Sequence, residues 1–309
     1  MNSVGRRGLV AGTALVVAVG VAAGSAFAAD APAAAGAVQK AQRAEQRAQG
    51  TPAKRAGGSV ETPTFPLYAV NKKNAQLDMF FADRTGGFEP AHTIDLDYSS
   101  FDDFINVDND KNGYSDGSWD AEKNGKLTYS WIDDIENVAK IKQVGTGYHI
   151  YAGKLLSPGQ LGGAKEADLL GVDKAGVLWE YLGYPGGSLT SRIKIGAGWG
   201  QYSQIAGQGD LTGDGKADIV ARDGYGVLWL YQGTGNYTAP FAPRTKVGAG
   251  WNIYDRLVSV GDLDADGTTD LVARKPNGEL YRYSGTGNAS APFQKPVKIG
   301  GGFQVYNIL

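Results

Sequence analysis

The 309-residue sequence contains no cysteine and only two histidines, His92 and His149. Without cysteine the chain can have no disulfide framework, no thiolate metal site and no cysteine-linked lipid. No serine, cysteine or metal-binding pattern surrounds either histidine, so we expect both to be packing or surface residues. A Gly-x-Ser-x-Gly elbow, a zinc-protease helix and a phosphate-binding glycine loop are also missing. We therefore expect no enzyme activity, although a pair of glycosidase carboxylates stays open as an alternative.

Positive charge is not in excess either. The chain has 30 basic and 32 acidic residues, and residues 67–309 hold 23 and 29 of these, a formal charge of −6. Binding to phosphate backbones needs a basic face. The composition therefore argues against nucleic acid as a partner.

The first 28 residues have the three parts of a secretory signal peptide. Arg6 and Arg7 give a positive start, an apolar stretch follows over 9–23, and Ala26-Phe27-Ala28 forms a small-residue cleavage site. An uncleaved membrane anchor is the alternative, and Sec or Tat export stays open. We expect a secreted, extracellular protein with no membrane span after signal cleavage.

Residues 29–66 differ in composition from the rest of the chain. They are rich in Ala, Gln, Lys and Arg, and Phe65 is their first aromatic residue. Such a segment cannot bury a core of its own. We therefore predict a basic linker that is disordered, with a transient helix over 33–49.

What the sequence has in abundance is glycine, with 46 residues, and a repeat that combines it with aromatic residues. A Gly-x-Gly-aromatic corner recurs at 144–151, 195–202, 247–254 and 299–306, and its aromatic residue is Tyr148, Trp199, Trp251 or Phe303. A divergent fifth copy lies at 94–101. A leucine repeats with the same period of about fifty residues, as Leu77, Leu127, Leu178, Leu228 and Leu280. Two markers with one period indicate five structural repeats.

Each repeat is typical of four short strands separated by Gly, Asn, Asp and Pro turns; in the clearest copy these cover 202–208, 217–223, 226–232 and 242–250. This predicts an all-β fold, a β-propeller of about five four-stranded blades. The repeats cover about 67–101, 102–151, 152–202, 203–254 and 255–309. The first repeat lacks a first strand, and residues 306–309 align with the start of one, so we expect the C-terminal strand to join the N-terminal blade. A piece of a larger array, closed by self-association, is the alternative, and the oligomeric state stays open.

When the repeats are aligned by these corners, four loops occupy equivalent positions, at 108–116, 160–168, 210–218 and 262–270. Three of them fit the pattern Asp-x-[Asp/Asn/Thr]-x-[Asp/Asn]-Gly-x-x-Asp. Calcium takes about 6–8 oxygen ligands, and alternating acids before a tight glycine turn supply such a set. The side chains at loop positions 1, 3, 5 and 9 and the carbonyl at position 7 are the predicted ligands: Asp108, Asp110, Asn112, Tyr114 and Asp116; Asp210, Thr212, Asp214, Lys216 and Asp218; Asp262, Asp264, Asp266, Thr268 and Asp270.

We thus predict up to three Ca²⁺ ions, with the loop at 262–270 as the fullest site. Loop 160–168 has lost its first three acidic ligands, so we expect no ion there. The loops are not EF-hands, because position 12 is not Glu. The alternative is that Asp and Gly only build turns.

The residues GDLTGDGKADIVAR (209–222) and GDLDADGTTDLVAR (261–274) resemble the FG-GAP or VCBS repeats of integrin α-chain propellers and of many secreted bacterial proteins. The resemblance covers 102–309 and, more loosely, 67–101. It implies calcium bound between the first two strands of a blade. Integrin heads have seven blades, which this chain is too short to form. In size the ring is similar to tachylectin-type lectins, an analogy of architecture alone.

These observations favour a secreted calcium-binding propeller that acts as a binding or adhesion module, lectin-like towards extracellular or cell-wall glycans. Tyr148, Trp199, Trp251 and Phe303 could stack on sugar rings or could fill the space between blades. Arg222 and Arg274 could bind an acidic ligand or cover neighbouring side chains. A structural or protein-docking propeller is the alternative, and a secreted polysaccharide hydrolase is a third hypothesis.

Overall fold

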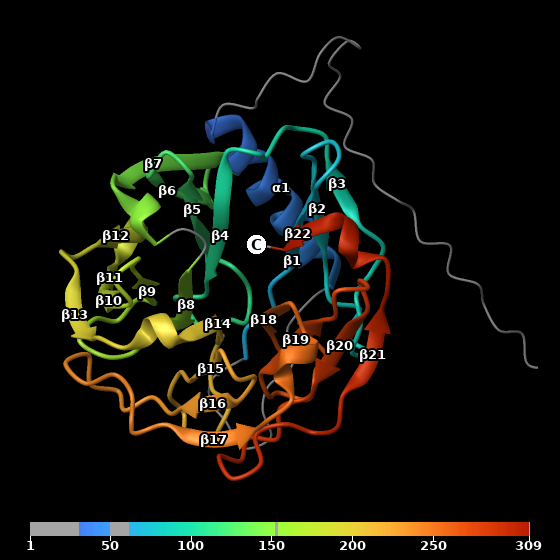
Figure 1. Cartoon of the computed structure of the whole chain (residues 1–309). Coiled ribbons are helices and arrows are strands. Elements are labelled where there is room, and N and C mark those ends of the chain that lie inside the picture. The colour runs from blue at the N-terminus through green and yellow to red at the C-terminus, as the bar shows by residue number, and fades with distance from the viewer. Residues whose placement is uncertain (1–30, 50–61, 152–153, 309) are drawn as a thin grey trace, which may run out of the picture.

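The computed structural model describes residues 31–49, 62–151 and 154–308, so the predicted signal peptide lies outside the described residues. Five four-stranded antiparallel sheets stand as blades around a central axis (Figure 1). The all-β propeller predicted from the repeat is therefore confirmed. Within the described residues, no helix is both long enough and apolar enough to cross a membrane.

The five blades follow the order of the chain, except that blade 1 takes one strand from each end. Blade 1 contains β22 (Tyr306–Ile308), β1 (Leu67–Asn71), β2 (Leu77–Phe80) and β3 (His92–Ile94). Blade 2 contains β4 (Phe101–Val107), β5 (Gly117–Glu122), β6 (Leu127–Ile132) and β7 (Ala139–Gly145). Blade 3 contains β8 (Leu155–Gly159), β9 (Asp168–Val172), β10 (Leu178–Tyr181) and β13 (Ile193–Gly196), with a hairpin of β11 (Gly183–Tyr184) and β12 (Ser188–Leu189).

The last two blades each consist of four strands that are consecutive in the chain. Blade 4 contains β14 (Tyr202–Ala206), β15 (Ile219–Asp223), β16 (Leu228–Tyr231) and β17 (Thr245–Gly248). Blade 5 contains β18 (Arg256–Gly261), β19 (Asp270–Arg274), β20 (Leu280–Tyr283) and β21 (Val297–Gly300).

The C-terminal strand closes the ring. Strand β22 pairs with β1 in antiparallel register, with Ala69 opposite Ile308 and Asn71 opposite Tyr306. It lies at the centre of the ring, beside the N-terminal blade (Figure 1). Closure therefore gives blade 1 the innermost strand that its N-terminal part lacks, so that all five blades have four strands.

The recurring leucines anchor the core. Leu77, Leu127, Leu178, Leu228 and Leu280 begin the third strand of their blades, and each is 0% exposed. The buried apolar residues form five clusters, one between each pair of neighbouring blades. The core is therefore divided around the ring, and each blade is stabilised mainly by its two neighbours.

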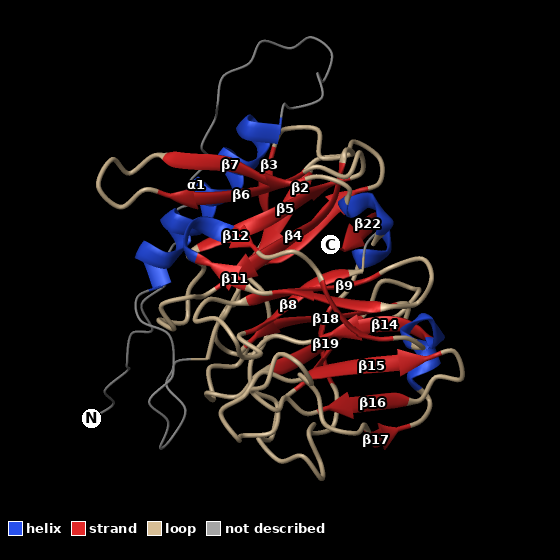
Figure 2. Ribbon diagram, turned by 90° about the vertical axis from the view of Figure 1, so that its left-hand side faces the viewer, coloured by secondary structure: helices blue, strands red, loops and turns tan. Residues whose placement is uncertain are grey.

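Because neighbouring strands in each blade run in opposite directions, the loops that join them lie on two opposite faces of the ring. The loops that join the first and second strands, and those that join the third and fourth, lie on one face of the ring, which we call the acidic face. The second-to-third hairpins and the corners that lead to the next blade lie on the opposite face. Short helical turns of the corners gather on one side of the molecule in the side view (Figure 2).

Helix α1 (Ala31–Gln49) covers the part of the predicted linker where a transient helix was expected over 33–49, and it packs against the blades instead of being transient. It lies between blades 1 and 2 (Figure 1), and its apolar residues Ala34, Val38 and Ala41 join the cluster between those blades. The Gln39 amide donates hydrogen bonds of 3.1 and 3.2 Å to the hydroxyls of Ser118 and Ser130. This helix has few large apolar residues, yet it packs against the blades because its small side chains permit a close approach. Its glutamine side-chain amides also form hydrogen bonds with buried polar groups.

Candidate functional site

The last aspartate of each acidic loop closes that loop. One carboxylate oxygen of Asp168, Asp218 and Asp270 accepts the N–H of the second loop residue, at 2.7, 3.0 and 3.0 Å. Asp116 does the same for Asn109 at 2.6 Å. Asp168 has this role in loop 160–168, which lacks the other acids. Position 9 therefore has a structural function that does not depend on a metal ion.

In loop 108–116 three acidic side chains lie close together and are more exposed to solvent than those of loop 262–270. Oxygen atoms of Asp108, Asp110 and Asp116 all lie within 4.8 Å of one another. The positive φ angles of Lys111 (60°) and Gly113 (89°) turn the backbone around this cluster. Among the described residues, these three acids form no ion pair. The donor set is entirely oxygen and carries three negative charges, which suits a hard divalent cation.

The pKa values of these acids reflect their crowding. Burial raises the pKa of Asp108 to about 7, and the charges of Asp116 and Asp110 act in the same direction. Burial also raises the pKa of Asp116, with a smaller contribution from Asp110. A bound cation would reverse this effect, because its charge favours the ionised carboxylates. The cluster is thus electrostatically costly unless a proton or a metal ion neutralises part of its charge.

Loop 262–270 forms a second cluster, in which Asp262, Asp264 and Asp270 have oxygens within 4.8 Å of one another. Burial raises the pKa of Asp262 to about 6 and that of Asp270 to about 7. Here a basic residue intervenes, because Arg282 Nη2 lies 3.1 Å from Asp264 Oδ2. Sequence reasoning missed Arg282, which reaches the loop from β20. The loop with the most acids is therefore already partly neutralised by the protein itself.

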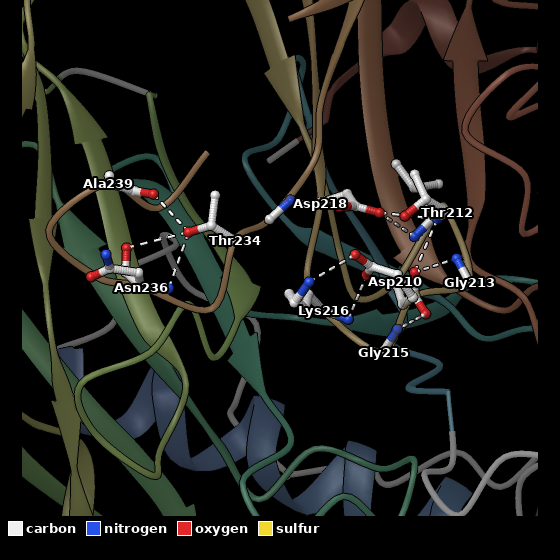
Figure 3. Close-up of polar contacts among 12 residues, drawn as sticks. Asp210, Thr212, Gly213, Gly215, Lys216, Asp218, Thr234, Asn236 and Ala239 are labelled. Carbon is white, nitrogen blue, oxygen red and sulfur yellow. Dashed lines mark hydrogen bonds and ion pairs between the residues drawn. The ribbon is translucent and has the colours of Figure 1, made fainter. Parts of the chain in front are cut away.

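Loop 210–218 does not assemble such a cluster. The Asp210 carboxylate accepts the backbone N–H groups of Thr212, Gly213 and Gly215 at 3.0, 2.6 and 2.8 Å (Figure 3). Asp214 pairs with Lys216, with the Nζ–Oδ2 distance at 3.1 Å. The acids here are held by backbone amides and one lysine, rather than directed at a common point.

A short segment before β1 connects the two assembled clusters. The Thr64 N–H donates to Gly113 O at 3.0 Å, and the Thr64 hydroxyl donates to Asp262 O at 2.9 Å. The Asp262 N–H in turn donates to Pro63 O at 2.9 Å. Residues 63 and 64 are therefore hydrogen-bonded to both loops.

The four corner aromatics pack inside the ring. Tyr148, Trp199, Trp251 and Phe303 are each 8% exposed. Trp199 contacts Tyr231 with ring centroids 4.7 Å apart, and Trp251 contacts Tyr283 at 4.5 Å. With their faces covered by neighbouring rings, these side chains fill the space between blades, the second of the two roles considered above.

The recurring arginines hold the corners. Arg222 Nη1 donates to Trp251 O at 3.1 Å and to Tyr254 O. Arg274 Nη1 donates to Phe303 O at 3.1 Å and to Tyr306 O at 2.8 Å. Both side chains are therefore engaged with backbone carbonyls. They fasten a corner to its blade instead of facing a ligand.

A pocket of about 390 Å³ opens on the acidic face beside loop 108–116. Its lining combines acids with aromatic rings: Asn109, Asp110, Asp116, Tyr129, Trp131, Glu166, Pro185 and Gly186. A second cavity, of about 100 Å³, follows the axis of the ring and is lined mainly by the innermost strands. None of these aromatic residues had been selected from the sequence, because Tyr129 and Trp131 lie outside the recurring corners.

Comparison with known proteins supports the repeat assignment. Residues 210–273 match the family of the FG-GAP-like repeat. This span contains loops 210–218 and 262–270, so the resemblance stated from the sequence is confirmed there. No curated protein matches the sequence at a significant level.

Several solved structures match at low sequence identity and with TM-scores below 0.5. The BP39L lectin from Burkholderia pseudomallei is 15% identical, with a TM-score of 0.47, over 80% of this chain and 71% of that one. AofleA from Arthrobotrys oligospora is 13% identical, with a TM-score of 0.44, over 81% and 72% of the two chains. Prp20p from Saccharomyces cerevisiae is 10% identical, with a TM-score of 0.36, over 74% and 60%.

Proposed function

We propose that this protein is a secreted β-propeller that binds calcium through its acidic loops and acts as a binding module for an extracellular glycan or protein. The observation that carries the calcium assignment is the convergence of Asp108, Asp110 and Asp116 within 4.8 Å. A repeated Asp-rich loop on the matched FG-GAP-like repeat supports it. Loop 108–116 would bind Ca²⁺ most strongly, because no basic side chain competes for its acids among the described residues.

In loop 108–116 the ligands would be the side-chain oxygens of Asp108, Asp110, Asn112 and Asp116 and the carbonyl of Tyr114. Calcium would neutralise carboxylates that now raise one another's pKa. Loop 262–270 would bind more weakly because Arg282 pairs with Asp264. In loop 210–218 the predicted calcium ligands include Thr212 and the carbonyl of Lys216. The ion pair between Asp214 and Lys216 would have to break before calcium could bind there.

Thermal unfolding in calcium and in excess chelator tests the assignment. If free Ca²⁺ stands tenfold above the dissociation constant, each site adds about 1.4 kcal/mol to the free energy of unfolding. Asp110→Asn should remove much of the calcium-dependent rise in Tm. The matched control is Asp97→Asn, since Asp97 accepts the N–H of Ser99 in a similar turn outside the acidic loops. If the Tm of the wild-type protein is the same in calcium and in chelator, the calcium assignment is wrong.

Binding experiments can distinguish a glycan-binding module from a structural or protein-docking propeller. A glycan array and a pull-down with isolated cell walls, both in calcium, would identify a sugar ligand. A protein-docking propeller would instead retain one protein partner and no soluble sugar. We expect no hydrolysis of the polysaccharides tested, and release of reducing sugar would contradict that expectation.

The proposal that the protein is secreted can be tested at its N-terminus. The signal peptide at 1–28 should be removed during secretion, and the mature protein should begin near Ala29. N-terminal sequencing of the protein recovered from culture medium measures this directly. Recovery of the full-length chain from the membrane fraction would favour the uncleaved anchor.

A further inference from the structure

The pocket of about 390 Å³ between blades 2 and 3, which we call the blade 2–3 pocket, has the size of a ligand site. Ligand pockets occupy about 300–1,000 Å³ and combine apolar walls with a few polar groups. Here Tyr129 and Trp131 on β6 form one wall, and the turn at 185–186 forms another. Asp110, Asp116 and Glu166 supply the polar groups.

The pocket is open because of a local difference between blades. In blade 4 the equivalent loop, 233–241, covers the neighbouring loop 160–168. A Cβ at Gly162 would lie 2.3 Å from Gly235 O, and one at Gly163 would lie 2.6 Å from the Tyr237 ring. In blade 3 the β11–β12 hairpin is shorter and is held down on blade 2, with Trp119 Nε1 donating to Gly187 O at 2.8 Å. Space is left above the outer half of β6.

A short loop alone does not produce a pocket. The corresponding loop of blade 1, 82–88, is also short, but the Arg282 guanidinium of blade 5 approaches Gly86 and takes up the space. The repeat position of Arg282 is occupied in blade 2 by Tyr129. An aromatic residue at this position, followed by Trp131, gives the blade 2–3 pocket an apolar floor.

Tyr129 and Trp131 pack against each other, but Tyr129 is only 4% exposed and is covered by Gly187, so Trp131 is the ring that a ligand can reach. The two ring centroids lie 5.8 Å apart with an interplanar angle of 29°, and Trp131 is half-buried, so part of its indole faces solvent. Such a surface suits the CH-rich face of a sugar ring.

Three carboxylates line the same pocket, whereas no lysine, arginine or histidine does. Asp110 and Asp116 are also proposed calcium ligands, so Glu166 is the carboxylate that remains for a sugar ligand. Glu166 and the lack of a basic residue in the lining disfavour an anionic ligand, and the Glu166 carboxylate provides acceptors for hydroxyl or ammonium donors.

We propose that the blade 2–3 pocket binds one sugar residue that carries no negative charge, stacked on Trp131 with its hydroxyl or amino groups donating to Glu166. The inference rests on the proposed binding function, not on calcium occupancy. It places the glycan site at a single position in the ring, rather than at five equivalent ones. It also replaces the corner aromatics with Trp131 as the stacking residue, since Trp131 is only partly buried.

The test measures binding of the mature protein, in calcium, to four immobilised sets of short oligosaccharides: neutral hexoses, N-acetylhexosamines, hexosamines and uronic acids. Binding is expected in at least one of the first three sets and absent from the uronic acids. Trp131→Ala should weaken binding at least tenfold. Glu166→Gln, which preserves shape, should weaken it severalfold and most strongly for hexosamines. Trp229→Ala is the matched control, since that half-buried indole is already covered by Arg244 at 4.0 Å.

The outcomes separate the two proposals. If the wild-type protein binds a neutral or amino sugar and both pocket variants bind it as strongly, the site lies elsewhere and this inference fails, while the binding function stands. If only uronic acids bind, the charge argument is wrong. If no sugar binds, the glycan role and the pocket assignment fall together, and calcium-dependent unfolding remains a separate question. Unchanged Tm values of Trp131→Ala and Glu166→Gln verify that folding is not the cause of any loss; if Trp131→Ala is destabilised, Glu166→Gln alone carries the test.

Discussion

Replacing Arg274 by alanine should loosen the closure of the ring. The buried guanidinium donates to two carbonyls of the last corner and strand, at 3.1 and 2.8 Å. It also makes two bonds to Asp255, at 2.8 and 3.1 Å. Because Asp255 is more than a third exposed, water can replace the arginine there, and that pair contributes little.

The magnitude follows from the two carbonyl bonds. Hydrogen bonds to charged groups each contribute about 1.5–3 kcal/mol, and water entering the cavity would recover part of the loss. We expect the free energy of unfolding to fall by about 3 kcal/mol. For a domain of this size that corresponds to a decrease in Tm of about 6–12 °C.

Arg222→Ala is the matched comparison, because Arg222 makes the same pair of carbonyl contacts at an internal corner. Both variants should lose stability, but only Arg274→Ala should speed hydrogen exchange in β22. Differential scanning calorimetry and peptide-level exchange measure the two effects. The reasoning is refuted if Arg274→Ala melts within about 2 °C of wild type, or if β22 exchanges at the wild-type rate in that variant.

Other variants test buried polar groups. Burial raises the pKa of Glu180 to about 8, and neither carboxylate oxygen has a hydrogen-bond partner among the described residues. The folded-state pKa lies above the unfolded value, so wild-type stability should fall as pH rises from about 4.5 to 8. Glu180→Gln should add about 1–3 kcal/mol at pH 8.5 and nothing at pH 5, measured by urea unfolding; a gain that is equal at both pH values would contradict this. Arg282→Gln should strengthen calcium binding about tenfold by releasing Asp264, and calorimetric titration that shows no gain would exclude that competition. Gln39→Leu should cost about 1–2 kcal/mol, because two buried hydroxyls lose their amide donor, and a wild-type Tm would count against an ordered α1.

The propeller could be predicted from the repeat because each recurring residue has a single structural role: the corner glycines form turns and the aligned leucines are buried. The glycine before each corner turn has a φ of 86–91°, which other residues rarely adopt. The leucines report burial in the third strand. Five copies of the leucine and four of the corner glycine determine blade number better than any single strand pattern could.

Helix α1 was underestimated because its composition is that of a solvated segment. The signal that could have identified it is positional: Ala34, Val38 and Ala41 are spaced four and three residues apart and form one helix face. Composition alone gives no information about a helix that packs through small residues and glutamines.

The details of the acidic face depend on pairings between distant residues. Arg282 lies in an ordinary strand position, and only the register of β19 with β20 carries it towards Asp264. The blade 2–3 pocket depends similarly on where a short hairpin rests. A repeat alignment shows that the hairpin is short, but not whether another side chain fills the space.

The pairing of β1 with β22 has a consequence for how the chain reaches its native state. Blades 2 to 5 consist of strands that are neighbours in sequence, so each can form soon after its residues are available. Blade 1 begins first and can be completed only when residues 306–308 arrive. Until then β1 presents an open edge that could pair with another chain. The ring is therefore expected to mature in a single late step, and its final three-residue strand determines when the full-length protein stops being prone to aggregation.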